Sequence, residues 1–244
     1  MTDALAVNEI FLSVQGESTW AGLPCVFVRL TGCHLRCSYC DTAYAFTDGE
    51  KRTLEEIRAR VHALAKPFAG VPGPQKLPLV ELTGGEPLLQ SNALPLLKSL
   101  CDDGFTVLLE TSGALDIAPV DPRVHRIMDL KCPSSGEAAR NRWENLPHLR
   151  ATDEIKFVIA TREDYDWARR IIAEHKLAAL CPLLFSWAAP LTAEQQDESL
   201  NQVPPGHTPI TRRRLAELIL ADALPVRFQL QMHKFIWPPD QRGV

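Results

Sequence analysis

The chain has 244 residues, of which 45% are hydrophobic and 23% are charged, and its formal net charge is −4. This composition is typical of a globular protein with a sizeable core, and the acidic balance gives no electrostatic footprint for nucleic acid. No apolar run reaches the length of a membrane span, and the N-terminus has no basic region before an apolar stretch. We therefore expect a cytoplasmic protein that forms a single domain over residues 1–244.

Predicted strands and helices alternate along most of the chain. Strands are expected at residues 25–30, 79–82, 105–109, 124–130, 155–159, 180–185 and 226–231. Helices are expected at residues 52–66, 92–101, 137–146, 162–175 and 211–220, the fourth with Thr161 as its N-cap. Residues 67–78 and 190–209 are expected to be loops, the second of them mobile. This alternation predicts right-handed βαβ units and a parallel sheet.

Polar residues follow several of the predicted strands. These polar segments are residues 31–33, 83–87, 110–113, 129–131 and 186–187. In a parallel barrel or a doubly wound sheet, the carboxyl ends of the strands meet on one face, and ligands bind there. We therefore expect one polar mouth, which contains the cysteines of residues 33–40.

Three of the seven cysteines lie close together, with the spacing C-x3-C-x2-C over Cys33, Cys37 and Cys40. Thiolate sulfur is the ligand that iron–sulfur clusters and zinc select, but three cysteines do not fill the usual shell of four. A structural zinc site would need His34, which is adjacent to Cys33 and poorly placed to share its metal. An iron–sulfur cluster with one open iron fits the spacing better. The remaining cysteines are far apart and are expected to be core residues.

Two motifs resemble those of the radical S-adenosylmethionine superfamily. Tyr39 places an aromatic residue directly before the last cysteine of the triplet, as in the superfamily's signature. Residues 83–87, Thr-Gly-Gly-Glu-Pro, resemble its glycine-rich segment, which binds the methionyl amino group. A Gly-Gly pair alone would indicate only a tight turn after a strand.

The stretches around these motifs carry a more specific resemblance. Residues 14–18 read Val-Gln-Gly-Glu-Ser, Arg29 lies on an apolar strand, and Asp41 and Thr42 follow the last cysteine. From the residues alone, the first stretch is a turn, and Arg29 is a buried charge that needs an anionic partner. Together with the motifs at residues 110–113, 131–136, 154–159 and 231–235, these stretches are similar to the 7-carboxy-7-deazaguanine synthase family over nearly the whole chain.

This resemblance implies a fold, an activity and partners. The fold is α/β, a partial, open (β/α) TIM-like barrel of the radical S-adenosylmethionine type with a mostly parallel sheet. The activity is that of a carbon–nitrogen lyase that converts 6-carboxy-5,6,7,8-tetrahydropterin to 7-carboxy-7-deazaguanine, with loss of ammonia, in queuosine biosynthesis. The implied cofactors are a [4Fe-4S] cluster, S-adenosylmethionine and Mg²⁺. The implied protein partners are an electron donor such as flavodoxin or ferredoxin and a second copy in a homodimer, with neither nucleic acid nor membrane.

The resemblance also implies roles for individual residues. The catalytic cluster would be held by Cys33, Cys37 and Cys40, and Mg²⁺ by Thr42. S-adenosylmethionine would contact Tyr39, Asp41, Gly84, Gly85, Glu86, Glu110, Ser112, Lys131 and Ser186. The pterin substrate would contact Val14, Gln15, Gly16, Glu17, Arg29, Thr83, His233 and Pro239. Residues 240–244 follow Pro239, so that only its backbone carbonyl is expected to reach the substrate.

Two alternatives remain open. Another radical S-adenosylmethionine enzyme, such as a glycyl-radical activating enzyme, would share the cysteines and the Gly-Gly pair but lack residues 15–17 together with Arg29. A non-catalytic zinc or iron–sulfur module for RNA would show a basic patch with aromatic residues, which this acidic chain does not. Glu154 and Lys156 share a strand face, where an interior ion pair and a ligand contact explain them about equally well.

Overall fold

The strands form one open, nine-stranded sheet in the computed structural model, which describes residues 3–73 and 75–244. The strands are β1 Ala4–Val14, β2 Pro24–Leu30, β3 Glu50–Thr53, β4 Leu79–Gly84, β5 Val107–Thr111, β6 His125–Asp129, β7 Glu154–Ile159, β8 Leu183–Trp187 and β9 Arg227–Gln229. They lie in the order β3-β1-β2-β4-β5-β6-β7-β8-β9, parallel from β2 to β9, with β1 antiparallel to both of its neighbours. Within the described residues β3 and β9 are free edges, so the sheet stays open and the expected partial barrel is confirmed.

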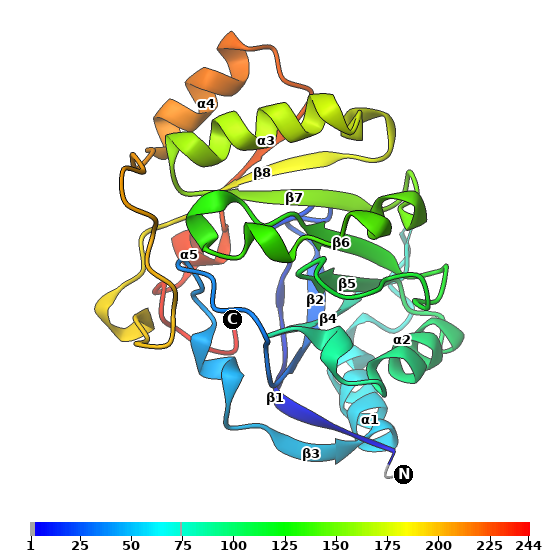
Figure 1. Ribbon diagram of the computed structural model, residues 1–244. Coiled ribbons are helices and arrows are strands. Elements are labelled where there is room, and N and C mark those ends of the chain that lie inside the picture. The colour runs from blue at the N-terminus through cyan, green and yellow to red at the C-terminus, as the bar shows by residue number, and fades with distance from the viewer. Residues whose placement is uncertain (1–2, 74) are drawn as a thin grey trace.

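Helices α1 to α4 lie on the outer side of this curved sheet (Figure 1). The α-helices are α1 Leu54–Ala65, α2 Ala93–Asp102, α3 Arg162–Glu174, α4 Arg212–Ala221 and α5 His233–Ile236. Short 3-10 helices in the connections include η1 Ala43–Phe46, η4 Pro133–Ser135, η5 Ala138–Arg140, η6 Trp143–His148 and η8 Ala193–Gln195. On the other side, α5 and the segment after it lie beside the cysteine segment, residues 31–42 (Figure 1). No helix in the described part of the chain has the length and hydropathy that a bilayer crossing requires.

Capping boxes set the start of two α-helices. Thr53 and Glu56 form a capping box before α1, in which Thr53 Oγ1 accepts from Glu56 N at 3.2 Å and the Glu56 carboxylate accepts from Thr53 N at 2.8 Å. Thr161 caps α3 in the same way, with Asp164 as its reciprocal partner, as the sequence predicts. These caps fix where each helix leaves its strand, and α3 in particular begins next to the cysteine-bearing face.

The concave face of the sheet has an apolar layer beneath a charged one. Near the amino ends of the strands lies a small buried cluster of Cys25, Leu79, Leu108, Ile127 and Leu184. Because successive side chains of a strand alternate between faces, Glu81, Glu110 and Asp129 lie on this same face, two residues further along β4, β5 and β6. The larger core fills the space between the opposite face and the outer helices. The charged groups of the site therefore lie directly above a layer of buried apolar side chains.

The helix predicted at residues 137–146 is wrong, since η5 and η6 occupy this stretch. Asn141 and Asn145 are buried there and bond to backbone groups of Lys131 and Gly113, which ties the stretch to the ends of β5 and β6 instead of to itself. Pro147 also disfavours a regular helix at this point. Strands β1 and β3 and helix α5 were not predicted. The polar loop at residues 190–209 is present and includes η8.

Asp153 is expected to be among the most important residues for stability. Its carboxylate is fully buried and accepts from Arg126 Nη2 at 2.6 Å and from Arg150 Nη2 at 3.0 Å. In the variant Asp153→Ala the buried guanidinium of Arg126 loses its anion, so the free energy of unfolding should fall by about 3–5 kcal/mol. Urea unfolding measures this loss. Asp166→Ala, which breaks an exposed pair with Arg162, is the matched control and should cost less than about 1 kcal/mol. Similar losses in both variants would contradict the prediction.

Candidate active site

A cavity of about 610 Å³ opens at the carboxyl ends of the parallel strands, within the size range of small-molecule sites. Most residues predicted from the sequence line it, namely Val14, Gln15, Gly16, Glu17, Arg29, Cys33, Cys37, Tyr39, Cys40, Asp41, Thr42, Thr83, Gly84, Gly85, Glu110, Ser112, Lys131, His233 and Pro239. Glu86 and Ser186 are buried outside this lining. The expected polar mouth, which contains the three cysteines, is confirmed.

The cysteine segment is held by residues 134–137, which follow β6. Ser38 is bonded to this stretch twice, because its N donates to Ser135 O at 3.1 Å and its Oγ to Ser134 O at 2.7 Å. Arg36 N donates to Glu137 Oε1 at 2.8 Å. Ser134 is in turn bonded through its N, at 2.8 Å, to the Asp164 carboxylate at the start of α3. The loop that carries the cysteines is thus braced against the sheet and a helix.

Cys33, Cys37 and Cys40 are free thiols that line this one cavity. Burial raises the pKa of all three thiols, that of Cys40 to about 12, and a metal centre that binds them would take the place of their protons. Within residues 3–73 and 75–244, no three His, Cys, Asp or Glu side chains are arranged to hold one metal ion. Three separate thiols around a cavity fit a cluster of several irons better than a single zinc ion.

The Gly-Gly pair at the end of β4 lets this strand approach the cysteine segment closely. A Cβ on residue 85 would lie 2.2 Å from Gly32 O and 2.8 Å from Cys33 Cβ, so only glycine fits there. Glu86 then turns away from the cavity and accepts from Ser112 N at 2.7 Å. It fastens the end of β4 to the end of β5, which keeps the glycines in place beside the thiols.

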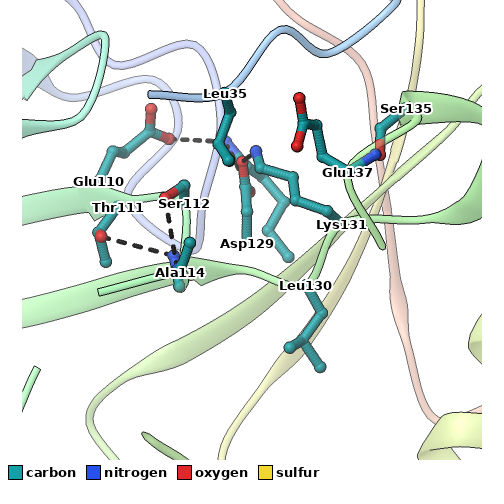
Figure 2. Close-up of polar contacts among 12 residues, drawn as sticks. Leu35, Glu110, Thr111, Ser112, Ala114, Asp129, Leu130, Lys131, Ser135 and Glu137 are labelled. Carbon is teal, nitrogen blue, oxygen red and sulfur yellow. Dashed lines mark hydrogen bonds and ion pairs between the residues drawn. The ribbon is translucent and has the colours of Figure 1, made fainter. Parts of the chain in front are cut away.

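Two lysines and three carboxylates form a charge network in the cavity wall, and Figure 2 shows three of its members, Glu110, Asp129 and Lys131. Lys156 Nζ lies 2.8 Å from Glu110 Oε1 and 2.9 Å from Glu17 Oε2. Lys131 Nζ lies 2.5 Å from Asp129 Oδ2, at the neighbouring strand end. Burial acts to lower the pKa of Lys156, but the carboxylates around it outweigh burial and raise that pKa well above its usual value. Both ammonium groups therefore stay charged.

The loop at residues 15–17 is held in place by contacts with Glu81 of β4 and His233 of α5. Gln15 Nε2 donates to a carboxylate oxygen of Glu81, and Gln15 Oε1 accepts from Glu17 N at 2.9 Å. A Cβ on residue 16 would lie only 2.8 Å from His233 Nδ1, so Gly16 allows α5 to pack against the loop. This contact brings His233 and the Gln-Gly-Glu turn, which are far apart in the sequence, to one wall of the cavity.

Glu81 is a buried acid whose pKa is shifted upward. Burial, followed by the charge of Glu110, raises the pKa of Glu81 well above its usual value of 4.5. Because the folded pKa is the higher one, the stability that this group contributes is present at low pH and falls as pH rises from about 4.5 towards the folded pKa. The variant Glu81→Gln carries a neutral side chain at every pH. Its free energy of unfolding, relative to that of the parent, should therefore rise by about 1.4 kcal/mol per pH unit as the pH increases through that window. Urea unfolding of the metal-free proteins tests this, and a difference that does not change with pH would contradict it.

Charged groups on the opposite wall are also paired. Arg29 Nε donates to Glu9 Oε1 at 2.7 Å, so the anionic partner that the sequence demands for Arg29 is found within the chain itself. Lys234 Nζ lies 2.6 Å from Asp41 Oδ2. Thr42 Oγ1 donates to the other oxygen, Asp41 Oδ1, at 2.9 Å. Arg29 lines the cavity, and its Nη groups have no hydrogen-bond partner among the described residues.

The sequence analysis missed several residues of the cavity wall, among them Tyr44, Glu81 and Lys234. Glu81 was recognisable, because a carboxylate within an apolar strand poses the same question of a partner as Arg29 does. Tyr44 and Lys234 carry no such local signal. Of the two explanations left open for Glu154 and Lys156, the structure shows an interior ion pair for Lys156, with Glu17 as a partner, whereas Glu154 accepts from Thr19 N at 3.1 Å.

Comparison with known proteins assigns the chain to a family. Residues 27–133 match the model of the Radical SAM superfamily. The 7-carboxy-7-deazaguanine synthase of Chlorobaculum tepidum is 45% identical to this chain, over 98% of the chain and 97% of the relative. That of Koribacter versatilis is 44% identical, over 98% of the chain and the full length of the relative. This chain belongs to the 7-carboxy-7-deazaguanine synthase family. The resemblance seen in the sequence is confirmed, and neither alternative, the activating enzyme or the RNA-binding module, is favoured.

Solved structures support the same fold. The crystal structure of QueE from Escherichia coli superposes with a TM-score of 0.66 at 20% identity, over 94% of this chain and 95% of that chain. Streptococcus suis SuiB bound to S-adenosylmethionine superposes with a TM-score of 0.53 at 13% identity, over 82% of this chain and 48% of that chain. At these identities the likeness concerns the fold alone. Membership of a radical S-adenosylmethionine family implies a [4Fe-4S] cluster and S-adenosylmethionine for this chain.

Proposed function

We propose that this chain is a carbon–nitrogen lyase that converts 6-carboxy-5,6,7,8-tetrahydropterin to 7-carboxy-7-deazaguanine on the route to queuosine. The substrate loses the atoms of one ammonia while its ring contracts, so no net oxidant or reductant is consumed. Family membership over nearly the full chain supports this reaction. The observation that carries the proposal is that one cavity joins the three cysteines to the Gln-Gly-Glu turn, Arg29 and His233.

Cys33, Cys37 and Cys40 are the residues that would hold the [4Fe-4S] cluster. When bound, the cluster and S-adenosylmethionine supply radical chemistry that amino-acid side chains do not offer. We assign the binding of S-adenosylmethionine to lining residues from three strand ends and the cysteine segment: Tyr39, Asp41, Gly84, Gly85, Glu110, Ser112 and Lys131. Glu86 and Ser186 lie outside the lining, so we assign them a supporting role behind these residues.

The remaining lining residues would bind the pterin. Val14, the turn at residues 15–17 and Thr83 offer amide, carbonyl and hydroxyl groups that suit the polar edge of a pterin ring. Arg29 offers its free Nη groups to the carboxylate of the substrate, and His233 closes the same wall. Thr42 Oγ1 would give Mg²⁺ one protein oxygen, which suits an ion that completes its shell with substrate and water. Pro239 O is bonded to Gln195 Nε2 at 2.8 Å, so Pro239 would shape the wall more than bind the substrate.

Four further assignments rest on the sequence and the family, and they complete the proposal. Residues 1–244 would form one domain, since the sheet runs from β1 near the start to β9 near the end. An electron donor such as flavodoxin or ferredoxin would reduce the cluster, and two copies would form a homodimer. Residues 190–209 would act as a lid that excludes water. This loop reaches the cysteine segment, because Asn201 N donates to Arg36 O at 2.8 Å.

An anaerobic assay tests the proposal. The reconstituted protein is incubated with reductant, S-adenosylmethionine, Mg²⁺ and 6-carboxy-5,6,7,8-tetrahydropterin, and the products are separated and identified by mass. We expect 7-carboxy-7-deazaguanine, formed only when the cluster is present. Protein that stays colourless and binds zinc under reconstitution, or brown protein that leaves the pterin unchanged, would refute the proposal.

A further inference from the structure

Arg242 lies at the rim of the cavity, in the segment that follows Pro239. Its guanidinium carbon is 4.0 Å from the centroid of the Tyr44 ring. Tyr44 belongs to η1, directly after the cysteine segment, and its hydroxyl donates to Glu9 Oε1 at 2.9 Å. The hydrogen bond to Glu9 therefore fixes the position of the ring, and the guanidinium of Arg242 packs against this ring as a cation–π partner.

Arg242 differs from the other arginine and lysine residues of the cavity lining in forming no ion pair with the described residues. Arg29, Lys131, Lys156 and Lys234 each form an ion pair with a carboxylate of the chain. Among the described residues, Arg242 forms neither an ion pair nor a hydrogen bond, and Asp240, which lines the same rim, is not bonded to it. Arg242 is thus the arginine of this lining whose guanidinium is not committed to a carboxylate of the described chain.

A guanidinium that stacks on an aromatic ring keeps its N–H groups free at its edge. These groups match the two oxygens of a carboxylate, which arginine binds through paired hydrogen bonds. The guanidinium carbon of Arg29 also lies 5.8 Å from the centroid of the Tyr44 ring, but its Nε donates to Glu9. Both arginines therefore lie close to the same ring in the cavity wall, and a carboxylate bound there could contact the two of them.

We propose that Arg242 is a specificity-determining residue that recognises the carboxylate of the pterin substrate at the cavity rim, on the stacking surface of Tyr44. This inference rests on the proposed function, and it adds to Arg29 a second carboxylate-binding group supplied by the segment after Pro239. A pterin without the carboxylate gains nothing from Arg242, so the residue separates carboxylated from uncarboxylated pterins.

Calorimetric binding of two stable, oxidised probes tests this role: 6-carboxypterin and unsubstituted pterin. Each is titrated anaerobically into the reconstituted holoenzyme with S-adenosylmethionine, as the parent protein and as Arg242→Gln and Arg242→Lys. We expect Arg242→Gln to weaken binding of 6-carboxypterin about tenfold and to leave that of pterin unchanged, while Arg242→Lys retains part of the preference. In turnover, Arg242→Gln should raise KM for the carboxylated substrate with little change in kcat.

Arg213→Gln is the matched control, because Arg213 is an exposed arginine of α4 paired with Glu217. It should change neither titration. If Arg242→Gln binds both probes as the parent does, while the parent prefers 6-carboxypterin and makes 7-carboxy-7-deazaguanine, the role of Arg242 is refuted and the proposed function stands. If the parent binds both probes equally, carboxylate recognition at this rim is refuted, and the product assay decides separately whether the proposed function holds.

Discussion

Replacing Cys37 by alanine is expected to abolish both cluster incorporation and product formation while leaving the fold intact. The thiol of Cys37 is buried in the cavity wall, between those of Cys33 and Cys40 in the sequence. A cubane that already lacks a fourth protein ligand would be left with two, and two thiolates do not retain it. Iron content and visible absorbance after anaerobic reconstitution measure the loss, and circular dichroism of the metal-free protein checks the fold.

Cys101→Ala is the control for this experiment. Cys101 is a buried cysteine at the end of α2, packed in the outer core and absent from the cavity lining. Its replacement should lower stability slightly and leave the iron content and the yield of product at the level of the parent. An equal iron content in Cys37→Ala and the parent would show that the cluster, if there is one, lies elsewhere.

Removing the charge of Lys156 is expected to cause a large loss in the free energy of unfolding. In Lys156→Met, Glu17, Glu110 and Asp129 lose the cation that they share in the cavity wall. Breaking one buried ion pair typically costs about 3–5 kcal/mol, and we expect a loss of at least this size at pH 8. Without Lys156 the pKa values of Glu110 and Asp129 rise, so stability should recover as the pH is lowered. Urea unfolding of the metal-free protein over a range of pH measures both effects.

Two further variants separate the charge effect from lost packing. Lys98→Met removes an exposed lysine that pairs with Asp102, and it should change stability by less than about 1 kcal/mol. Lys156→Met combined with Glu110→Gln removes a cation and one of its carboxylates together, and it should regain part of the loss. A double variant that is no more stable than Lys156→Met at pH 8 would contradict an electrostatic cause.

Much of the fold was predictable, because its signals are local. The parallel strands from β4 to β8 are short apolar runs between turns, and Thr161 before α3 is a cap that can be read from four residues. The stretch at residues 137–146 was not predictable in this way. Its backbone is held by the side chains of Asn141 and Asn145, which bond to strand ends that only the folded chain brings near.

The residues of the candidate site also differ in whether their signal is local in the sequence or depends on contacts made in the folded chain. The cysteine triplet and the Gly-Gly pair are compact motifs, and the topology of a parallel sheet predicts that they meet at its carboxyl edge. The pairings of Arg29 with Glu9 and of Asp41 with Lys234 join segments that have no sequence signal in common. Which cation of the cavity stays unpaired depends on all of these contacts together. Arg242 was therefore visible only in the structure.

The most direct test of the proposed ring contraction is the ratio of ammonia to 7-carboxy-7-deazaguanine formed by the reconstituted enzyme from 6-carboxy-5,6,7,8-tetrahydropterin. Both are quantified in the same anaerobic reaction at several times, with protein that lacks the cluster as the blank. The account predicts that the two products appear in equal amounts and only with the cluster present. Cleavage of S-adenosylmethionine without either product, or ammonia without the deazaguanine, would contradict it.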